Sequence, residues 1–277
     1  MYPVGSLLIT GRGGFLDRAH VICHCLLIEL GDRMILVDTG FGSHDLVNPE
    51  SRFGTAPARM LNIEKDQSRT AIHQIRAMGY DPLAVTDILM THLDFDHAGG
   101  LADFPWANVH VLDIEHDVAT RPQTFVQRSR YCQAQFEHGP KWVQHMISGH
   151  ERWFGFEFIP VLPDVPEEIL FIPLMGHSAG HCGIALKDSG TWLLHCGDAV
   201  LCHQELATLE PDAPLGIRLF EKFVSDNEEA VIANQALLRQ LVHEHTLDLQ
   251  VFCSHDPFMF ESVPPTAPAA VLVGAQA

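Results

Sequence analysis

The 277-residue chain contains 47 % apolar and 19 % charged residues, which is the balance of an ordinary globular protein. Its 17 basic and 35 acidic residues give a formal charge of −18, which would repel a phosphate backbone and excludes nucleic acid as a major partner. No apolar stretch approaches the roughly 20 residues that a membrane-spanning helix needs, and the first residues do not resemble a secretory signal. We therefore expect a cytoplasmic protein with no membrane partner.

The cysteine and histidine content points away from disulfides and toward metal or acid–base chemistry. The seven cysteines lack the spacing of a disulfide framework, so we interpret them as reduced thiols. Cys23 and Cys25 flank His24 in the alternating run 21–28, where a period of two places both thiols on one strand face as small buried hydrophobes. The 18 histidines, several beside Asp and Gly, are the unusual feature of the composition.

The first third of the chain alternates strand-like runs with one helix. We predict strands at 6–10, 21–30 and 34–37, with a hairpin turn at Gly31 and Asp32 between the last two. A Pro- and Gly-rich stretch at 43–62 is predicted to be irregular, a helix is expected at 68–78, and a short buried strand at 86–90.

The rest of the chain repeats this pattern of strand and helix. A strand and helix follow from Val109, and residues 123–153 are interpreted as one or two helices of an inserted lid, at about 120–155, with solvated His138, His145 and His150. Later elements are strands at 169–174, 182–186, 192–196 and 249–253, a helix at 228–245, and an extended tail from about 262, which includes Pro264 to Pro268. The order predicts one α+β domain, 1–277, in which two halves pack as helix, sheet, sheet, helix.

A dense group of metal-ligand residue types follows the predicted strand at 86–90. His92, Asp94, Asp96 and His97 lie within six residues, and Gly99 and Gly100 permit close backbone approach. Such a loop can direct nitrogen and oxygen donors into one small volume, so we predict a metal site that two ions could share.

Five motifs in order resemble the metallo-β-lactamase superfamily, whose fold is a four-layer αβ/βα sandwich. They are Leu36 to Gly40, Thr91 to Gly100, Gly176 to His181, Cys196 to Ala199 and Ser254 to Asp256. The motif around Phe95 is most similar to that of the N-acyl homoserine lactone lactonases. The resemblance implies a binuclear metallohydrolase that uses a hydroxide between two divalent ions to open a cyclic ester.

The resemblance also implies a set of ligands. One ion would be held by His92, Asp94 and His177, the other by Asp96, His97 and His255, with Asp198 bridging them; Asp96 and Asp198 would be the catalytic residues. Asp94 is a departure, because the family usually has His there. We expect zinc first, with manganese or iron as alternatives, because a third carboxylate makes the site formally less positive and favours harder ions.

The substrate class and several neighbouring residues stay open at this stage. Phe95 would line an acyl pocket or pack in the core, and the tyrosine that lactonases carry after the bridging Asp is absent here. Other esters, thioesters or phosphodiesters, a diiron redox role without a flavodoxin-like partner domain, and a metal-free scaffold are alternatives. The expected partner is a small ester or lactone, and a homodimer is left open.

Four further residues near the motifs receive a structural interpretation or an undecided one. His181 could orient a metal ligand or cap a turn. His195 and Cys196 are interpreted as packing residues at a strand end. Asp38 is expected to accept backbone hydrogen bonds in its own turn.

Overall fold

The computed structural model describes residues 1–149, 151–165, 167–188, 190–207, 210, 212–262 and 270–273. In spatial order, the first sheet contains β13 (Ala270–Val273), β1 (Cys25–Leu30), β2 (Arg33–Val37), β3 (Val85–Leu89), β4 (Asn108–Leu112) and β5 (Lys141–His145). The second contains β12 (Leu249–Phe252), β11 (Thr191–His195), β10 (Cys182–Asp188), β9 (Ile169–Pro173) and β8 (Ile159–Pro160). A separate pair is formed by β6 (Arg152–Trp153) and β7 (Phe156–Glu157).

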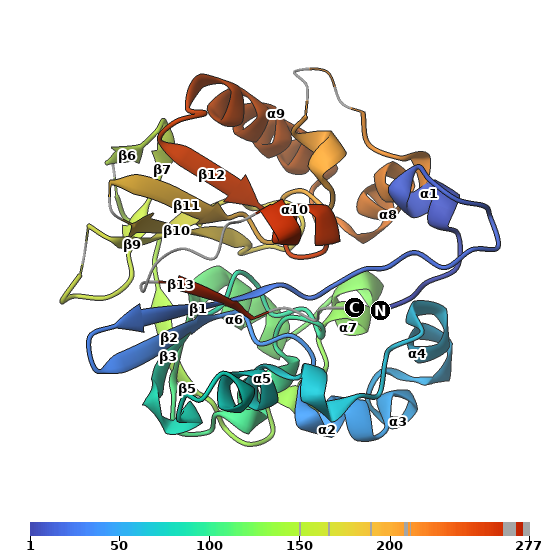
Figure 1. Ribbon diagram of the computed structural model, residues 1–277, viewed down its shortest axis with the longest axis horizontal. Helices are drawn as coiled ribbons and strands as arrows, with labels where there is room; N and C mark the ends of the chain where they lie inside the picture. Colours follow the sequence, from blue (N-terminus) through green and yellow to red (C-terminus); the bar gives the residue numbers. More distant parts are fainter. Residues whose placement is uncertain are drawn as a thin grey trace.

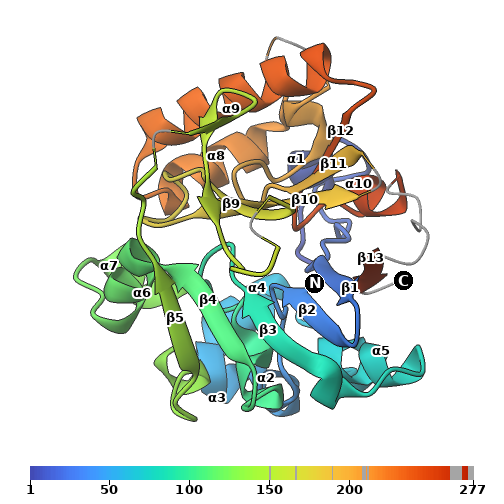
Figure 2. The same cartoon turned by 90° about the vertical axis from the view of Figure 1, so that its left-hand side faces the viewer.

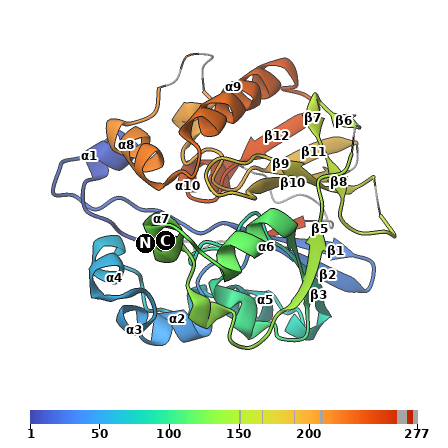
Figure 3. The ribbon, with the colours of Figure 1, turned by 180° about the vertical axis from the view of Figure 1, so that it is seen from behind.

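Helices cover the outer faces of the two sheets (Figures 1 and 2). The helices of the described residues are α1 (Ser6–Thr10), α2 (Ser43–Val47), α3 (Pro49–Phe53), α4 (Thr55–Leu61), α5 (Ala71–Ala77), α6 (Asp113–Thr120), α7 (Phe125–Arg130), α8 (Leu215–Val224), α9 (Glu228–Glu244) and α10 (Pro257–Ser262). In the view from behind, α8 and α9 lie outside the second sheet, while α2 and α5 lie outside the first (Figure 3). The order of layers is therefore the four-layer α+β sandwich predicted from the motifs.

Strand β1 shows why its sequence reads as a nearly continuous apolar run. Leu26 and Ile28 belong to the core between the two sheets, whereas Cys25 and Leu27 belong to a second core that includes Ile75 of α5. A strand that is buried on both faces has no polar face to alternate with. Within the described residues, no helix is both long enough and apolar enough to cross a membrane.

Residues 6–10 form helix α1, so the predicted strand is wrong. The amides of Leu8 and Ile9 donate to the Gly5 carbonyl, and Gly11 ends the helix in the left-handed conformation, with φ of 72°. The helix packs against α8. A glycine at a helix C-terminus was the overlooked signal.

The stretch 43–62, predicted to be irregular, contains the three short helices α2, α3 and α4. Its Pro and Gly residues act at helix ends: Pro49 occupies the first turn of α3, and the side chain of Asn48 accepts a hydrogen bond from the Ser51 amide. Proline in the first turn and a polar N-cap favour the start of a helix. These residues therefore mark the ends of short helices here, and do not indicate an irregular segment.

The segment at about 120–155 is only partly helical. Residues 125–130 form α7, but β5 at 141–145 pairs in parallel with β4 as an edge strand of the first sheet. The half-buried His145 was predicted to be solvated, yet its Nε2 lies 2.9 Å from His110 Nδ1 and its ring contacts Phe171. His138 is exposed as expected, and His150 lies outside the described residues.

The remaining predicted elements are confirmed, with boundaries moved by a few residues. The helix expected at 68–78 is a short 3₁₀ turn followed by α5, and the helix at 228–245 is α9. Helix α8 was not predicted. Of the predicted tail, residues 263–269 lie outside the described residues, while β13 pairs antiparallel with β1.

Candidate metal centre

Four polar loops meet at one edge of the two sheets. His177 follows β9, Asp198 follows β11 and His255 follows β12; these strands run in the same direction, so their carboxyl ends meet at the same edge of the second sheet. The loop that follows β3 of the first sheet carries His92 and its neighbours to the same place. The Cys182 amide donates to the Thr91 carbonyl at 2.9 Å and ties this loop to the second sheet.

His92, Asp94 and His177 form the first group of donors. Asp94 Oδ2 lies 3.2 Å from His177 Nε2 and 3.6 Å from His92 Nε2. All three side chains are buried. The structure therefore brings together the three residues predicted for the first ion.

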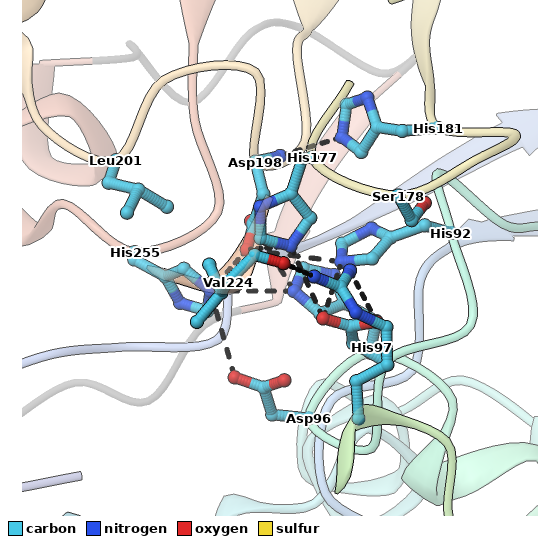
Figure 4. Close-up of polar contacts among 12 residues, drawn as sticks. His92, Asp96, His97, His177, Ser178, His181, Asp198, Leu201, Val224 and His255 are labelled. Carbon is cyan, nitrogen blue, oxygen red and sulfur yellow. Dashed lines mark hydrogen bonds and ion pairs between the residues drawn. The ribbon is translucent and has the colours of Figure 1, made fainter. Parts of the chain in front are cut away.

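Asp96, His97 and His255 form the second group. His255 Nε2 lies 3.6 Å from Asp96 Oδ2 and 3.4 Å from His97 Nε2. Asp96 stands somewhat apart from the other donors (Figure 4). These are the three residues predicted for the second ion.

Asp198 lies between the two groups (Figure 4). Its Oδ2 is 3.1 Å from His255 Nε2 and 3.5 Å from His177 Nε2, and its Oδ1 is 3.4 Å from His97 Nε2. Burial raises the pKa of Asp198, but His255 and His97 outweigh burial and hold this pKa well below its ordinary range. Asp198 contacts both groups, as a bridging carboxylate would.

The arrangement fits a bound cation. His92 Nε2 and Asp198 Oδ1 are buried, and neither has a hydrogen-bond partner among the residues that the structure describes. Burying a polar atom without a partner is unfavourable, so such atoms mark a place for a ligand. Donor atoms of His92, His177 and Asp198, and those of His97, Asp198 and His255, lie within 4.8 Å of one another. Imidazole nitrogens and carboxylate oxygens at this spacing are suited to divalent transition metals.

Asp38 orients His97, a role that the turn interpretation missed. Its Oδ2 accepts a hydrogen bond from His97 Nδ1 at 2.9 Å, and its two oxygens accept from the amide and hydroxyl of Thr91. Because Nδ1 carries the proton, Nε2 of His97 is left to face the centre. Asp38 therefore positions the predicted ligand His97 through a side-chain hydrogen bond, and its role is not confined to its own turn.

His181 does orient a candidate ligand, through the backbone. Its Nδ1 donates to the Leu174 carbonyl at 3.0 Å, and its Nε2 accepts from the Asp198 amide at 2.9 Å. Burial holds the pKa of His181 well below its ordinary range, so the ring is neutral and can accept this bond. A Cβ at Gly197 would lie 2.5 Å from this Nε2, which explains the glycine before Asp198. His195 and Cys196 are buried packing residues, as predicted.

Glu115 of α6 joins the two loops that carry His92 and His177. Its Oε1 accepts from the Leu93 amide, and its Oε2 accepts from the Ser178 hydroxyl and the Gly180 amide, at 2.7 to 2.9 Å. The carboxyl is fully buried. Sequence reasoning missed Glu115 because no motif contains it.

Arg130 of α7 was also missed. Its Nη1 donates to Asp94 Oδ1 at 3.1 Å, and its Nη2 donates to the Val224 carbonyl at the end of α8. Burial raises the pKa of Asp94, but Arg130 and His92 outweigh burial and hold it well below its ordinary range. The carboxylate is therefore ionised beside a buried cation.

Phe95 lies in a group of three aromatic rings beside the donors. Its ring centroid is 5.0 Å from that of Phe53 and 6.1 Å from that of Phe41, and all three side chains are half-buried. The group offers an apolar surface next to the site.

The interpretation of Cys23 as a buried hydrophobe is wrong. The residue is half-buried, and its sulfur lies within 4.8 Å of donor atoms of Asp96 and His255. Cys25 is buried in the core as predicted, and all seven cysteines are free thiols.

Comparison with known families identifies the class of protein. The family model of the metallo-beta-lactamase superfamily matches residues 19–233. The chain therefore belongs to the metallo-β-lactamase superfamily, and this family together with its metallo-hydrolase relatives identifies it as a metal-dependent hydrolase.

Two curated relatives are similar to this chain in sequence. The chain is 38 % identical over 247 residues to the probable metallo-hydrolase Rv2300c of Mycobacterium tuberculosis. This alignment covers 89 % of this chain and 78 % of the relative. It is 30 % identical over 174 residues to the N-acyl homoserine lactonase of Bacillus thuringiensis, and this alignment covers 61 % of each chain.

Solved lactonase structures share the fold. A mutant of B. thuringiensis AiiA with N-decanoyl-L-homoserine at its active site superposes with a TM-score of 0.67 at 20 % identity, over 97 % of this chain and 94 % of that one. AidC, a dizinc quorum-quenching lactonase in complex with its product, gives a TM-score of 0.60 at 15 % identity, over 98 % and 90 % of the two chains.

Proposed function

We propose that this chain is a binuclear hydrolase of cyclic esters, with N-acyl homoserine lactones as the first substrate class to test. The observation that carries the proposal is that the seven predicted donors lie together, and that two of their atoms, His92 Nε2 and Asp198 Oδ1, are buried without a hydrogen-bond partner among the described residues. The lactonase relative and the lactonase fold neighbours support this choice among the hydrolases of the superfamily.

The proposed ligand set is the one expected from the motifs. His92, Asp94 and His177 would hold one divalent ion, Asp96, His97 and His255 would hold the other, and Asp198 would contact both. Two such ions would polarise an ester carbonyl and make a bound water a stronger nucleophile. Zinc is the proposed metal, in line with the dizinc lactonase neighbour.

The residues of the chain have distinct roles in this proposal. Asp38 and the Ile22 carbonyl hold the Nδ1 protons of His97 and His255, so both Nε2 atoms face the centre. The Asp96 side chain is 14 % exposed and stands at the edge of the donor group. We assign to Asp96 the movement of one proton: its carboxylate would accept a proton from the attacking water and pass it to the leaving alkoxide oxygen, because a bound substrate can reach it.

The aromatic group of Phe41, Phe53 and Phe95 would contact the acyl chain. No tyrosine follows Asp198 in the sequence, so no phenol from that loop would assist the carbonyl. The seven free thiols agree with a reducing compartment such as the cytoplasm.

The test is a substrate panel with defined metals. Protein loaded separately with zinc, manganese or iron would be assayed for acid release from lactones of short and long acyl chain, a thioester and a phosphodiester. We expect lactones to have the highest kcat/KM. Phe95→Ala should raise KM for long-chain lactones more than for short ones, whereas the exposed Phe223→Ala should change neither. Preference for the thioester or phosphodiester would contradict the proposal.

A further inference from the structure

Cys23 is delivered to the centre by a short backbone ladder. The Ile22 amide donates to the His255 carbonyl at 3.4 Å, and the His24 amide donates to the Ser254 carbonyl at 2.8 Å. His255 Nδ1 donates back to the Ile22 carbonyl at 2.7 Å. The segment 22–24 therefore runs beside the candidate ligand His255, with Cys23 between the two backbone contacts.

The alternation of an extended chain then decides where Cys23 points. His24 is buried on the side of Phe252 and Phe260, whose ring centroids lie 4.8 and 4.7 Å from its own. Successive side chains of an extended segment face opposite ways, so Cys23 faces away from these rings. On that side its sulfur, a carboxylate oxygen of Asp96 and an imidazole nitrogen of His255 lie within 4.8 Å of one another.

Packing alone accounts poorly for a thiol at this place. Cys25, two residues further along, is 3 % exposed and belongs to the apolar core beside α5. Cys23 belongs to neither core and is half-buried; both thiols border a small cavity beside Thr39 and Phe41, but only Cys23 also lies within 4.8 Å of donor atoms of Asp96 and His255. The two thiols share a strand face but differ in surroundings, which makes Cys25 a matched control.

We propose that Cys23 supplies a thiolate ligand to the ion held by Asp96 and His255. On binding, the thiol proton would be released to solvent as the sulfur–metal bond forms. Thiolate is a soft donor that favours zinc, whereas the carboxylate of Asp94 favours harder ions. The two halves of the centre would therefore differ, with the half that contains Cys23 selective for zinc. This inference rests on the metal-binding part of the proposed function and on no particular substrate.

Cobalt(II) reports a thiolate ligand without any enzymatic assay. The cobalt-loaded protein should show thiolate-to-cobalt charge-transfer absorption in the near ultraviolet. Cys23→Ala and Cys23→Ser should lose this band, while Cys25→Ala should keep it. In competition with a chromophoric chelator, Cys23→Ala should weaken zinc binding at one of the two positions by about tenfold or more, since loss of a residue that only orients a metal ligand already costs about 10–100-fold. Thermal unfolding of each variant would confirm that it is folded.

Several outcomes would overturn the inference. These are absence of the band from the parent protein, its persistence in Cys23→Ala, or an equal loss in Cys25→Ala. Failure of the parent to bind cobalt or zinc would overturn both this inference and the metal requirement of the proposed function. A thiolate band in a protein that hydrolyses no lactone would support the inference and contradict only the substrate.

Discussion

Arg130 Nη1 lies 3.1 Å from Asp94 Oδ1, and both side chains are buried. This pair changes the charge of the centre. The three carboxylates of the donor set carry −3, and Arg130 brings the total to −2, which is also the total for two carboxylates with the usual His at position 94. Arg130, which no motif contains, offsets the charge of Asp94, so the net charge of the centre does not by itself favour manganese or iron, and only the oxygen donor of Asp94 does.

The first prediction concerns this pair. Asp94→His would leave the Arg130 charge buried beside two metal ions without its partner. Removing one member of a buried ion pair costs about 3–5 kcal/mol, so the free energy of unfolding should fall by this amount and metal content should fall with it. Urea unfolding and elemental analysis would measure both.

The double variant Asp94→His/Arg130→Gln is the control. It restores the balance of charge around the ions, so it should recover most of the stability and metal content lost in Asp94→His. The single variant Arg130→Gln completes the cycle. If the effects of Asp94→His and Arg130→Gln simply add in the double variant, the two residues are not coupled and the argument from charge fails.

The second prediction separates a bridging ligand from a terminal one. Asp198 contacts His177 of one group and His97 and His255 of the other, whereas the donors that His255 contacts among the seven are Asp198 and members of the second group. Asp198→Ala should therefore release both ions, and His255→Ala should retain about one per chain. Elemental analysis after metal-replete purification would give these ratios. Equal retention in both variants would contradict the bridging role.

The third prediction concerns Glu115, which holds the loops of His92 and His177 together. Glu115→Gln replaces an acceptor oxygen with an amino group that faces donors, and each buried donor left unpaired costs about 1–3 kcal/mol. We expect a fall in unfolding free energy of about 3 kcal/mol and weaker binding of the first ion. Gly180→Ala should act similarly, because its Cβ would lie 2.3 Å from the Glu115 amide nitrogen.

Asp117→Asn on the same helix is the matched control. Asp117 is exposed and pairs with the exposed Arg121 and, at 3.8 Å, with His116 Nδ1, so its loss should change stability by less than about 0.5 kcal/mol. A similar loss for both helix positions would show that Glu115 contributes through the helix and not through the two loops.

The predicted ligands could be found in the sequence because each follows a strand within a short motif. His92, Asp96 and His97 are close along the chain, and His177, Asp198 and His255 are brought to them by strand ends that meet at one edge. The short motifs reveal the candidate ligands in the sequence, and the fold then brings the motifs together. The apolar runs of β1 and β3 predicted their strands for the same reason, since burial on both faces leaves a clear pattern.

The residues that support the ligands could not be found in this way. Arg130 reaches Asp94 from 36 positions away and Glu115 reaches Ser178 from 63, and neither lies in a motif. For Cys23 the period of two correctly placed both thiols on one face, but it did not reveal what covers that face at each position. Helix α1 was missed because five apolar and polar residues are too few to distinguish periods of 2 and 3.6.

The last prediction concerns a carboxyl pair that anchors α8. Glu221 of α8 and Glu205 are hydrogen-bonded to each other, and Gln235 of α9 donates to both. Burial, followed by the charge of Glu205, raises the pKa of Glu221 to about 9. Glu221 therefore keeps its proton at neutral pH, while Glu205 accepts hydrogen bonds from the amides of Leu201 and Cys202.

A raised pKa in the folded state means that stability is full below the pKa of the unfolded chain and is lost as the pH rises toward 9. The free energy of unfolding should accordingly decrease between about pH 5 and pH 9 in the parent protein. Glu221→Gln keeps a hydrogen-bonding side chain that cannot ionise, so this decrease should shrink and the variant should be more stable than the parent at pH 9, by about 1–3 kcal/mol. Urea unfolding across this pH range would measure both proteins. Parallel pH profiles for the two would mean that Glu221 is already ionised when the protein is folded.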